Sequence, residues 1–248
     1  MKKIMLYKVL PLLAVALMGL AMATSCEEEN NVSGNSGNNG GDETPVGWVD
    51  LGLPSGLLWA ECNVGATAPE QYGDYFAWGE TQPKSVYDWR NYIYCIVDER
   101  TGDPDTLTKY NTLSSYGIPD SLTVLLPGDD AATVNMGNGA RTPTREDWQE
   151  LLDNTISEWT TLNGVYGLQF SANGKTLFLP AAGYFKDSDI YFIDGEQSYG
   201  YYSSASLNGN NPIFICDFYF YSETQSLIDN YNFRSTGLSV RAVRAGRK

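Results

Sequence analysis

Carboxylates are the side chains on which any acid–base chemistry of this chain would depend. The sequence holds 30 Asp and Glu residues and no histidine. Without histidine, catalysis by Ser-His-Asp or Cys-His groups is excluded, and the commonest zinc ligand in proteins is missing. No phosphate-binding glycine loop or dinucleotide fingerprint occurs either. We therefore expect no catalytic residue, no metal site and no cofactor, while a carboxylate-dependent enzyme such as a glycoside hydrolase stays open as an alternative.

Asp129 and Asp130 form a carboxylate pair shortly before the clearest helical pattern of the chain. Acidic side chains at such positions accept hydrogen bonds from free backbone N–H groups in turns and helix caps. We therefore interpret this pair as a turn or cap element in preference to a catalytic pair.

Cysteine supplies a second kind of chemistry, at Cys26. Basic residues near the N-terminus precede an apolar run over residues 9–23, and the letters ATSC then end at Cys26 like the lipobox of bacterial lipoproteins. The expected reactions link acyl chains to Cys26 after cleavage before it, so that residues 1–25 are a signal peptide and the protein binds a membrane through acylated Cys26. An ordinary secretory signal is the alternative. A spanning helix is less favoured, because the run is short for the roughly 20 residues that a bilayer requires.

The segment after Cys26 predicts an exposed tether. Glu27, Glu28 and Glu29 are similar to the acidic export signal that sends lipoproteins to the outer face of the outer membrane, although a merely solvated charge run is an alternative. Residues 30–43 are rich in Asn, Gly and Ser and cannot form a core. We expect residues 26–45 to be a flexible tether and the protein to be a lipid-anchored protein of the outer membrane that faces the cell exterior.

Three further cysteines, Cys62, Cys95 and Cys216, lie in the remaining chain and form no CxxC spacing. Thiolate zinc binding is therefore disfavoured. A Cys62–Cys95 disulfide and free thiols both remain open. Cys216 falls within an alternating aromatic strand pattern, which predicts a buried, inert thiol.

One short helix is marked at residues 144–152. Thr144 is a good N-cap, and Asp147 is placed to complete a capping box. Trp148, Leu151 and Leu152 share one face, so the helix has an apolar stripe to bury.

Most of the chain after this helix reads as hairpins. Asn163-Gly164, Asn173-Gly174 and Asp194-Gly195 each separate two strand patterns and suit the type I′ turn, whose two central residues need positive φ. Residues 213–221 alternate with period two. Residues 81–128 are less patterned and predict an insertion that covers one end of the domain.

Four ordered motifs carry a resemblance to a known family. Arg141, Pro143, Thr144, Asp147 and Trp148 form RxPTxxDW, and related stretches lie at residues 48–80, at 177–185 with 200–206, and at 237–244. Together they resemble the Fibrobacter succinogenes major paralogous domain of Bacteroidetes surface lipoproteins, a branch of the C-type lectin-like and formylglycine-generating-enzyme-like fold. The resemblance implies an α+β class, with residues 46–248 forming a β-rich C-type lectin-like domain of many short strands and hairpins and one or two short helices. It also implies that the last strand lies beside the first, and it implies no established reaction.

The resemblance further implies that late loops form a binding face. These loops are residues 186–189, 207–212 and 222–234, and the candidate ligand-binding side chains in or beside them are Tyr191, Asn208, Asn210, Tyr221 and Tyr231. Tyr and Asn suit adaptable recognition.

We expect a non-catalytic binding module for an extracellular glycan or protein. Nucleic acid is excluded as a partner, because a formal charge of −14 repels phosphate backbones. The alternatives are that these loops are merely solvated, or that the chain is a structural, fimbria-associated subunit with an exposed strand edge or apolar patch.

Overall fold

A computed structural model describes residues 47–228 and 232–246, which all lie in the compact unit Thr44–Lys248. Cys26, Glu27, Glu28, Glu29 and Tyr231 fall outside the described residues, as do residues 1–25 and the expected tether. Within the described part, no helix is long and apolar enough to cross a membrane.

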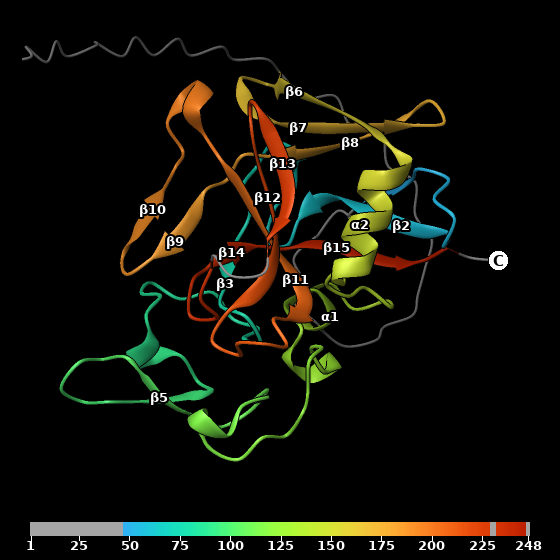
Figure 1. The fold of residues 1–248 in the computed structure, drawn as a ribbon. Helices are drawn as coiled ribbons and strands as arrows, with labels where there is room; N and C mark the ends of the chain where they lie inside the picture. Colours follow the sequence, from blue (N-terminus) through green and yellow to red (C-terminus); the bar gives the residue numbers. More distant parts are fainter. Residues whose placement is uncertain (1–46, 229–231, 247–248) are drawn as a thin grey trace, which may run out of the picture. The chain divides into compact units, whose positions relative to one another are not determined.

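The described chain is built mainly of short strands in several small sheets (Figure 1). A three-stranded sheet contains β1 (Trp48–Asp50), β2 (Leu57–Asn63) and β15 (Arg241–Ala245) in the order β1-β2-β15. A five-stranded sheet has the order β13-β12-β11-β14-β3, with β13 (Thr224–Ile228), β12 (Ile215–Tyr221), β11 (Gly200–Leu207), β14 (Leu238–Ser239) and β3 (Tyr75–Phe76). A second three-stranded sheet contains β6 (Ile156–Leu162), β7 (Val165–Ala172) and β8 (Lys175–Pro180).

Two hairpins and a few helices complete the described chain. The hairpins pair β4 (Cys95–Val97) with β5 (Pro104–Leu107) and β9 (Tyr184–Lys186) with β10 (Asp189–Tyr191). The α-helices are α1 (Ala131–Met136) and α2 (Arg145–Asn154), and the 3₁₀ helices are η1 (Trp89–Asn91), η2 (Ser114–Tyr116), η3 (Pro127–Asp129) and η4 (Gly195–Gln197). The prediction of an α+β, β-rich domain with many short strands and one or two short helices is confirmed.

Helix α2 begins where its cap predicts. The Thr144 hydroxyl accepts a hydrogen bond from the Asp147 N–H at 3.3 Å, and the Asp147 carboxylate accepts one from the Thr144 N–H at 2.7 Å. Trp148 and Leu151 are fully buried. Trp148 lies 4.7 Å from Trp59 between ring centroids and stacks on Phe218 of β12. The apolar stripe of α2 therefore covers the inner face of the five-stranded sheet.

Two of the three expected hairpin turns form and one does not. Asn163-Gly164 and Asn173-Gly174 have positive φ at both positions and join β6 to β7 and β7 to β8. Asp194 has φ −98° and Gly195 begins η4 instead, so the hairpin prediction at this position is wrong. The reason is that both edges of β11 are occupied, by β12 and β14, and β10 pairs with β9. The last strand also differs from expectation, because β15 pairs with β2 and not with β1.

The aspartate pair before α1 has a structural role at both positions. Asp130 is the N-cap of α1 and accepts hydrogen bonds from the N–H of Ala132 and from the hydroxyl and N–H of Thr142. Asp129 accepts hydrogen bonds from Tyr94 and Tyr110 and pairs with Lys109. The interpretation of this pair as a cap or turn element is confirmed for Asp130. Asp129, the last residue of η3, instead connects η3 to Tyr94, Lys109 and Tyr110 of the insertion.

All three described cysteines are free thiols. The Cys62–Cys95 disulfide that the sequence left open is therefore absent. Cys216 is buried on β12, as its strand pattern predicts. Burial raises the pKa of the Cys62 thiol and raises the pKa of the Cys95 thiol to about 11, which keeps both protonated near neutral pH.

Candidate functional site

The five-stranded sheet carries aromatic rings on both of its faces. Strand β12 alternates Phe218 and Phe220, which are fully buried, with Tyr219 and Tyr221, which are partly exposed. Side chains alternate between faces along a strand, so the phenylalanines point toward α2 and the tyrosines toward the opposite side. Phe has no hydroxyl to satisfy in a core, whereas the polar end of Tyr suits a surface that water reaches.

The tyrosines of the second face form a continuous row with rings from the β9–β10 hairpin. Tyr201 lies opposite Tyr219 across the β11–β12 pairing, with ring centroids 5.0 Å apart. Just before β11, Tyr199 lies 5.2 Å from Tyr221 and 4.8 Å from Phe192. On the hairpin, Tyr184 stacks on Tyr191 at 5.3 Å. We call these residues the outer aromatic surface: Tyr184, Tyr191, Phe192, Tyr199, Tyr201, Tyr219 and Tyr221.

One end of this surface is covered and the other is open. Tyr201 is only 2% exposed and belongs to a buried cluster with Trp78 and Tyr110, which the chain before α1 supplies. Tyr191 and Phe192 are 39% and 42% exposed. Large apolar side chains with this exposure in one place are typical of a binding surface.

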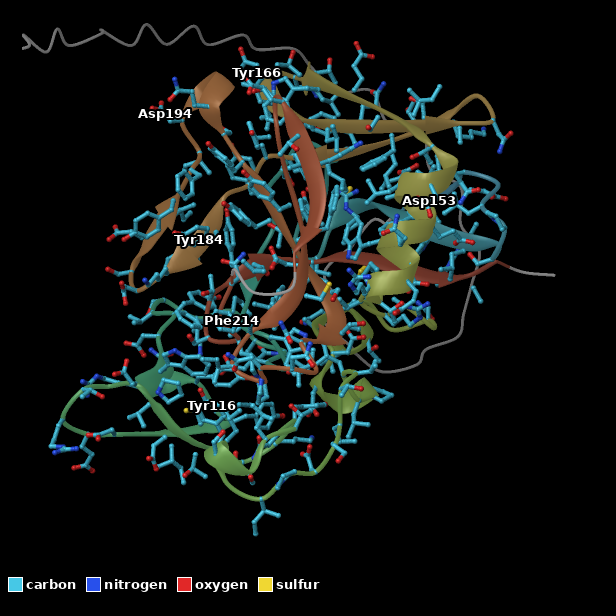
Figure 2. The ribbon with its side chains drawn as sticks, viewed as in Figure 1. Tyr116, Asp153, Tyr166, Tyr184, Asp194 and Phe214 are labelled. Carbon is cyan, nitrogen blue, oxygen red and sulfur yellow. The ribbon has the colours of Figure 1, made fainter. Side chains whose placement is uncertain are left out.

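A groove of about 610 Å³ opens at the exposed end. Phe192, Tyr199 and Tyr221 line it together with Asp194, Gln197, Ser222 and Glu223. Figure 2 shows Asp194 above Tyr184 on the side of the sheet away from α2. Within the described part of the chain, the side chains of Asp194, Gln197 and Glu223 make no hydrogen bond or ion pair. The groove therefore combines exposed rings with two carboxylates and an amide whose hydrogen-bonding capacity is unused by the protein.

The structure brings some of the expected ligand-binding residues together and separates others. Tyr191 and Tyr221 both belong to the outer aromatic surface. Asn208 and Asn210 follow the opposite end of β11, a strand of 8 residues that spans about 23 Å at 3.3 Å per residue. Asn208 is buried, and its side-chain oxygen accepts hydrogen bonds from the N–H groups of Asn210 and Asn211, so it shapes its own turn.

Sequence reasoning missed most of the groove. Phe192, Tyr199, Asp194, Gln197 and Glu223 were not among the candidate residues. The signal for Tyr199 was present, because Tyr199 and Tyr201 share a strand face and Tyr221 and Tyr219 lie opposite them. No local pattern marks Asp194 or Glu223, since η4 and the β12–β13 turn bring them to the groove.

The groove offers a ligand three aromatic rings, two carboxylates and an amide. Among the described residues, no group of three or more Cys, Asp or Glu side chains could hold a metal ion. Asp194 and Glu223 are both exposed, so neither carboxyl is shielded from water.

Comparisons with known proteins give no relative. No family model matches the chain, and no curated protein or solved structure matches it.

Proposed function

We propose that this chain is a surface-exposed outer-membrane lipoprotein whose C-type lectin-like domain binds an extracellular glycan or protein without catalysis. A glycan is the ligand that the groove fits best. The observation that carries the proposal is the open groove in which Phe192, Tyr199 and Tyr221 surround unpaired Asp194, Gln197 and Glu223.

A sugar ring matches this groove in two ways. Its C–H bonds form an apolar face that packs on the negative face of an aromatic ring. Its hydroxyl groups donate hydrogen bonds to carboxylate and amide oxygens, which Asp194, Gln197 and Glu223 offer. The rings are held by one another before any ligand arrives, which lowers the entropic cost of binding.

The lectin-like fold and the membrane anchor are supported by different observations. The RxPTxxDW motif contributes Thr144 and Asp147 to the capping box and Trp148 to the core, so the residues that carry the family resemblance have structural roles here. The anchor is supported by the lipobox at Cys26 and by Glu27–Glu29 after it. Replacing Cys26 with Ala should release the protein from membranes, and protease added to whole cells should cleave the wild type.

Binding is tested with the full chain purified in detergent. A glycan array identifies a ligand, and calorimetry then compares Tyr221→Ala and Phe192→Ala with wild type. Loss of one ring from a small site should weaken binding about tenfold, or 1.4 kcal/mol. Tyr166→Ala is the control, because it removes a partly exposed ring on β7 that lies outside the outer aromatic surface and its groove. Unchanged affinity in both site variants, or a loss confined to Tyr166→Ala, would place the ligand elsewhere.

A carboxylate-dependent glycoside hydrolase is the second candidate, because Asp194 and Glu223 line the same groove. A general acid of this class needs a carboxyl whose pKa is raised, usually by burial. Both side chains are exposed, which favours binding over hydrolysis. Release of reducing ends from a bound glycan, abolished by Glu223→Gln, would establish the enzyme instead.

A subunit of a surface assembly is the third candidate. Strand β13 is an edge of the five-stranded sheet, and Ile190 and Ile193 on and after β10 are 37% and 40% exposed. Exposed strand edges and apolar side chains suit protein docking. A protein that stays monomeric with no co-purifying partner would count against this candidate.

A further inference from the structure

A second groove lies where the insertion meets the body of the domain. Its volume is about 550 Å³, within the roughly 300–1,000 Å³ common for small-ligand sites. One wall comes from the insertion, through residues 87–90, 101–104 and Tyr116, and the other from the body, through residues 186–187, Ile213 and Phe233 with residues 235–236. Figure 1 shows the turn of the β9–β10 hairpin above the insertion. This insertion groove shares no lining residue with the groove of the outer aromatic surface.

The aromatic part of the insertion groove is fixed by ring contacts. Phe233 stacks on Phe214 with centroids 4.8 Å apart and planes 22° from parallel. Trp89 meets Phe233 edge-on at 5.7 Å and packs against the buried Tyr92 at 5.5 Å. Figure 2 shows Phe214 on the body, above Tyr116 in the insertion. Trp89 and Phe233 are both partly exposed, so they offer the groove a preformed apolar platform.

Two cations of the groove are unpaired, which is uncommon in this chain. Of the lysine and arginine side chains that the structure describes, only those of Arg90, Lys175 and Lys186 make no hydrogen bond, ion pair or ring contact. Arg90 and Lys186 both line the insertion groove, one from each wall. In a chain with 30 acidic and 16 basic residues, two cations that line one groove without an ion pair are free to bind an anionic group of a ligand.

The Arg90 guanidinium lies close to the backbone of Gly102. A Cβ atom on Gly102 would lie 2.6 Å from the Nη2 atom of Arg90 and 3.0 Å from its Cζ atom. Gly102 has φ +81°, a conformation that glycine adopts readily. Glycine at this position therefore leaves room for the guanidinium beside the groove wall, and a planar guanidinium can bind both oxygens of a carboxylate.

We propose that the insertion groove binds an acidic oligosaccharide of the uronic-acid class. The sugar carboxylate lies between Arg90 and Lys186, and a sugar ring packs on Trp89 and Phe233. Three carboxylates also line the groove: Asp88, whose Oδ1 accepts a hydrogen bond from the Asn91 N–H, Asp103 and Asp187. They accept hydrogen bonds from sugar hydroxyls and repel a second close carboxylate. The ligand therefore carries spaced carboxylates and is not a dense polyanion. This site is independent of the glycan groove proposed above.

Calorimetry of the full chain in detergent tests the proposal with tetragalacturonate, and with neutral galactotetraose and tetraglutamate as comparison ligands. Tetragalacturonate should bind, and added salt should lower its affinity because salt screens the attraction between the charges. Arg90→Gln and Lys186→Gln should each weaken binding about tenfold, because each removes a charge-assisted hydrogen bond. Trp89→Ala should weaken it to a similar extent.

Lys175→Gln is the matched control, since Lys175 is the third unpaired cation and lies on the β7–β8 hairpin away from the groove. Its binding should equal that of wild type, and the melting temperatures of all three charge variants should be unchanged. Equal losses in Lys175→Gln and Arg90→Gln, equal binding of galactotetraose or tetraglutamate, or no binding of tetragalacturonate would each overturn the proposal. Tyr221→Ala should leave this binding intact, which separates the result from failure of the other groove.

Discussion

The indole of Trp148 on α2 stacks on the ring of Phe218 on β12, with centroids 4.8 Å apart and planes 23° from parallel. The Trp148 Nε1–H also donates a hydrogen bond to the Ser203 carbonyl of β11 at 3.3 Å. One side chain thus joins the helix to two neighbouring strands of the five-stranded sheet. Because α2 covers the inner face of these strands, Tyr202 of β11 is buried beside Trp148, whereas Tyr219 and Tyr221 of β12 lie on the opposite face, where Tyr221 lines the groove.

Replacing Trp148 with Ala should strongly destabilise the domain. The side chain is fully buried between Trp59, Phe218 and Tyr202, so its removal leaves a large cavity. We expect the free energy of unfolding, measured by urea denaturation, to fall by about 3–5 kcal/mol. Ile118→Ala is the control, because Ile118 is 91% exposed and should change this value by less than about 0.5 kcal/mol. Similar values for both variants would show that α2 is not packed as described.

Replacing Thr144 with Ala should remove the N-cap of α2. The Asp147 N–H would lose its acceptor, and the free energy of unfolding should fall by about 1 kcal/mol. Thr144→Ser keeps the hydroxyl and should recover most of the loss. Thr161→Ala alters an exposed strand position on β6 and controls for the loss of a threonine. A capping role is contradicted if Thr144→Ser is as unstable as Thr144→Ala in the same urea titration.

Features that depend on neighbours in sequence were predictable. The capping box depends on Thr144 and Asp147, three residues apart, and the type I′ turns depend on Asn-Gly pairs that tolerate positive φ. The alternation in β12 likewise identified the buried face that carries Phe218 and Phe220. The cap and the turns depend on interactions between residues close in sequence. In β12, the alternation with period two shows which face of the strand is buried.

Features that depend on distant pairing were not predictable. Asp194-Gly195 has the residues of a hairpin turn, but β14 and β12 already occupy both edges of β11, and no local signal records this. The sequence predicts Asn208 as a ligand-binding residue, but its side-chain oxygen accepts hydrogen bonds from the Asn210 and Asn211 N–H groups. The groove residues Asp194 and Glu223 come from separate turns, so only the assembled sheet places them together.

The cysteines give a direct test of the packing. Cys62, Cys95 and Cys216 should all be alkylated by iodoacetamide in denatured protein that has not been reduced, because each is a free thiol. In native protein at pH 7.4, all three should react far more slowly, since Cys62 and Cys216 are buried and the Cys95 pKa is raised to about 11. Peptide mass spectrometry measures each site. A Cys62–Cys95 disulfide would leave both of these sites unmodified until a reductant is added.

Asp129 should make the stability of the domain depend on acid pH. Burial disfavours its charge, but hydrogen bonds from Lys109, Tyr110 and Tyr94 outweigh this effect and hold its pKa below the usual 3.8. A carboxylate with a lowered folded-state pKa stabilises the protein above its unfolded-state pKa, and this contribution is lost as pH falls through the folded-state value.

Asp129→Asn should therefore lower the free energy of unfolding by about 1–3 kcal/mol at pH 7, because three donors lose a charged acceptor. The difference from wild type should begin to shrink as the pH falls below 3.8, where the unfolded state becomes protonated, and it should become small below the lowered folded-state pKa, where wild-type Asp129 is protonated in both states. Asp98→Asn is the matched control, because Asp98 also has a pKa lowered by its hydrogen bonds from Arg100 but is a surface carboxylate. Exposed pairs contribute little, so this control should hardly change stability at pH 7. A difference between wild type and Asp129→Asn that is constant from pH 7 to pH 2 would show that the carboxylate charge does not hold the insertion to η3.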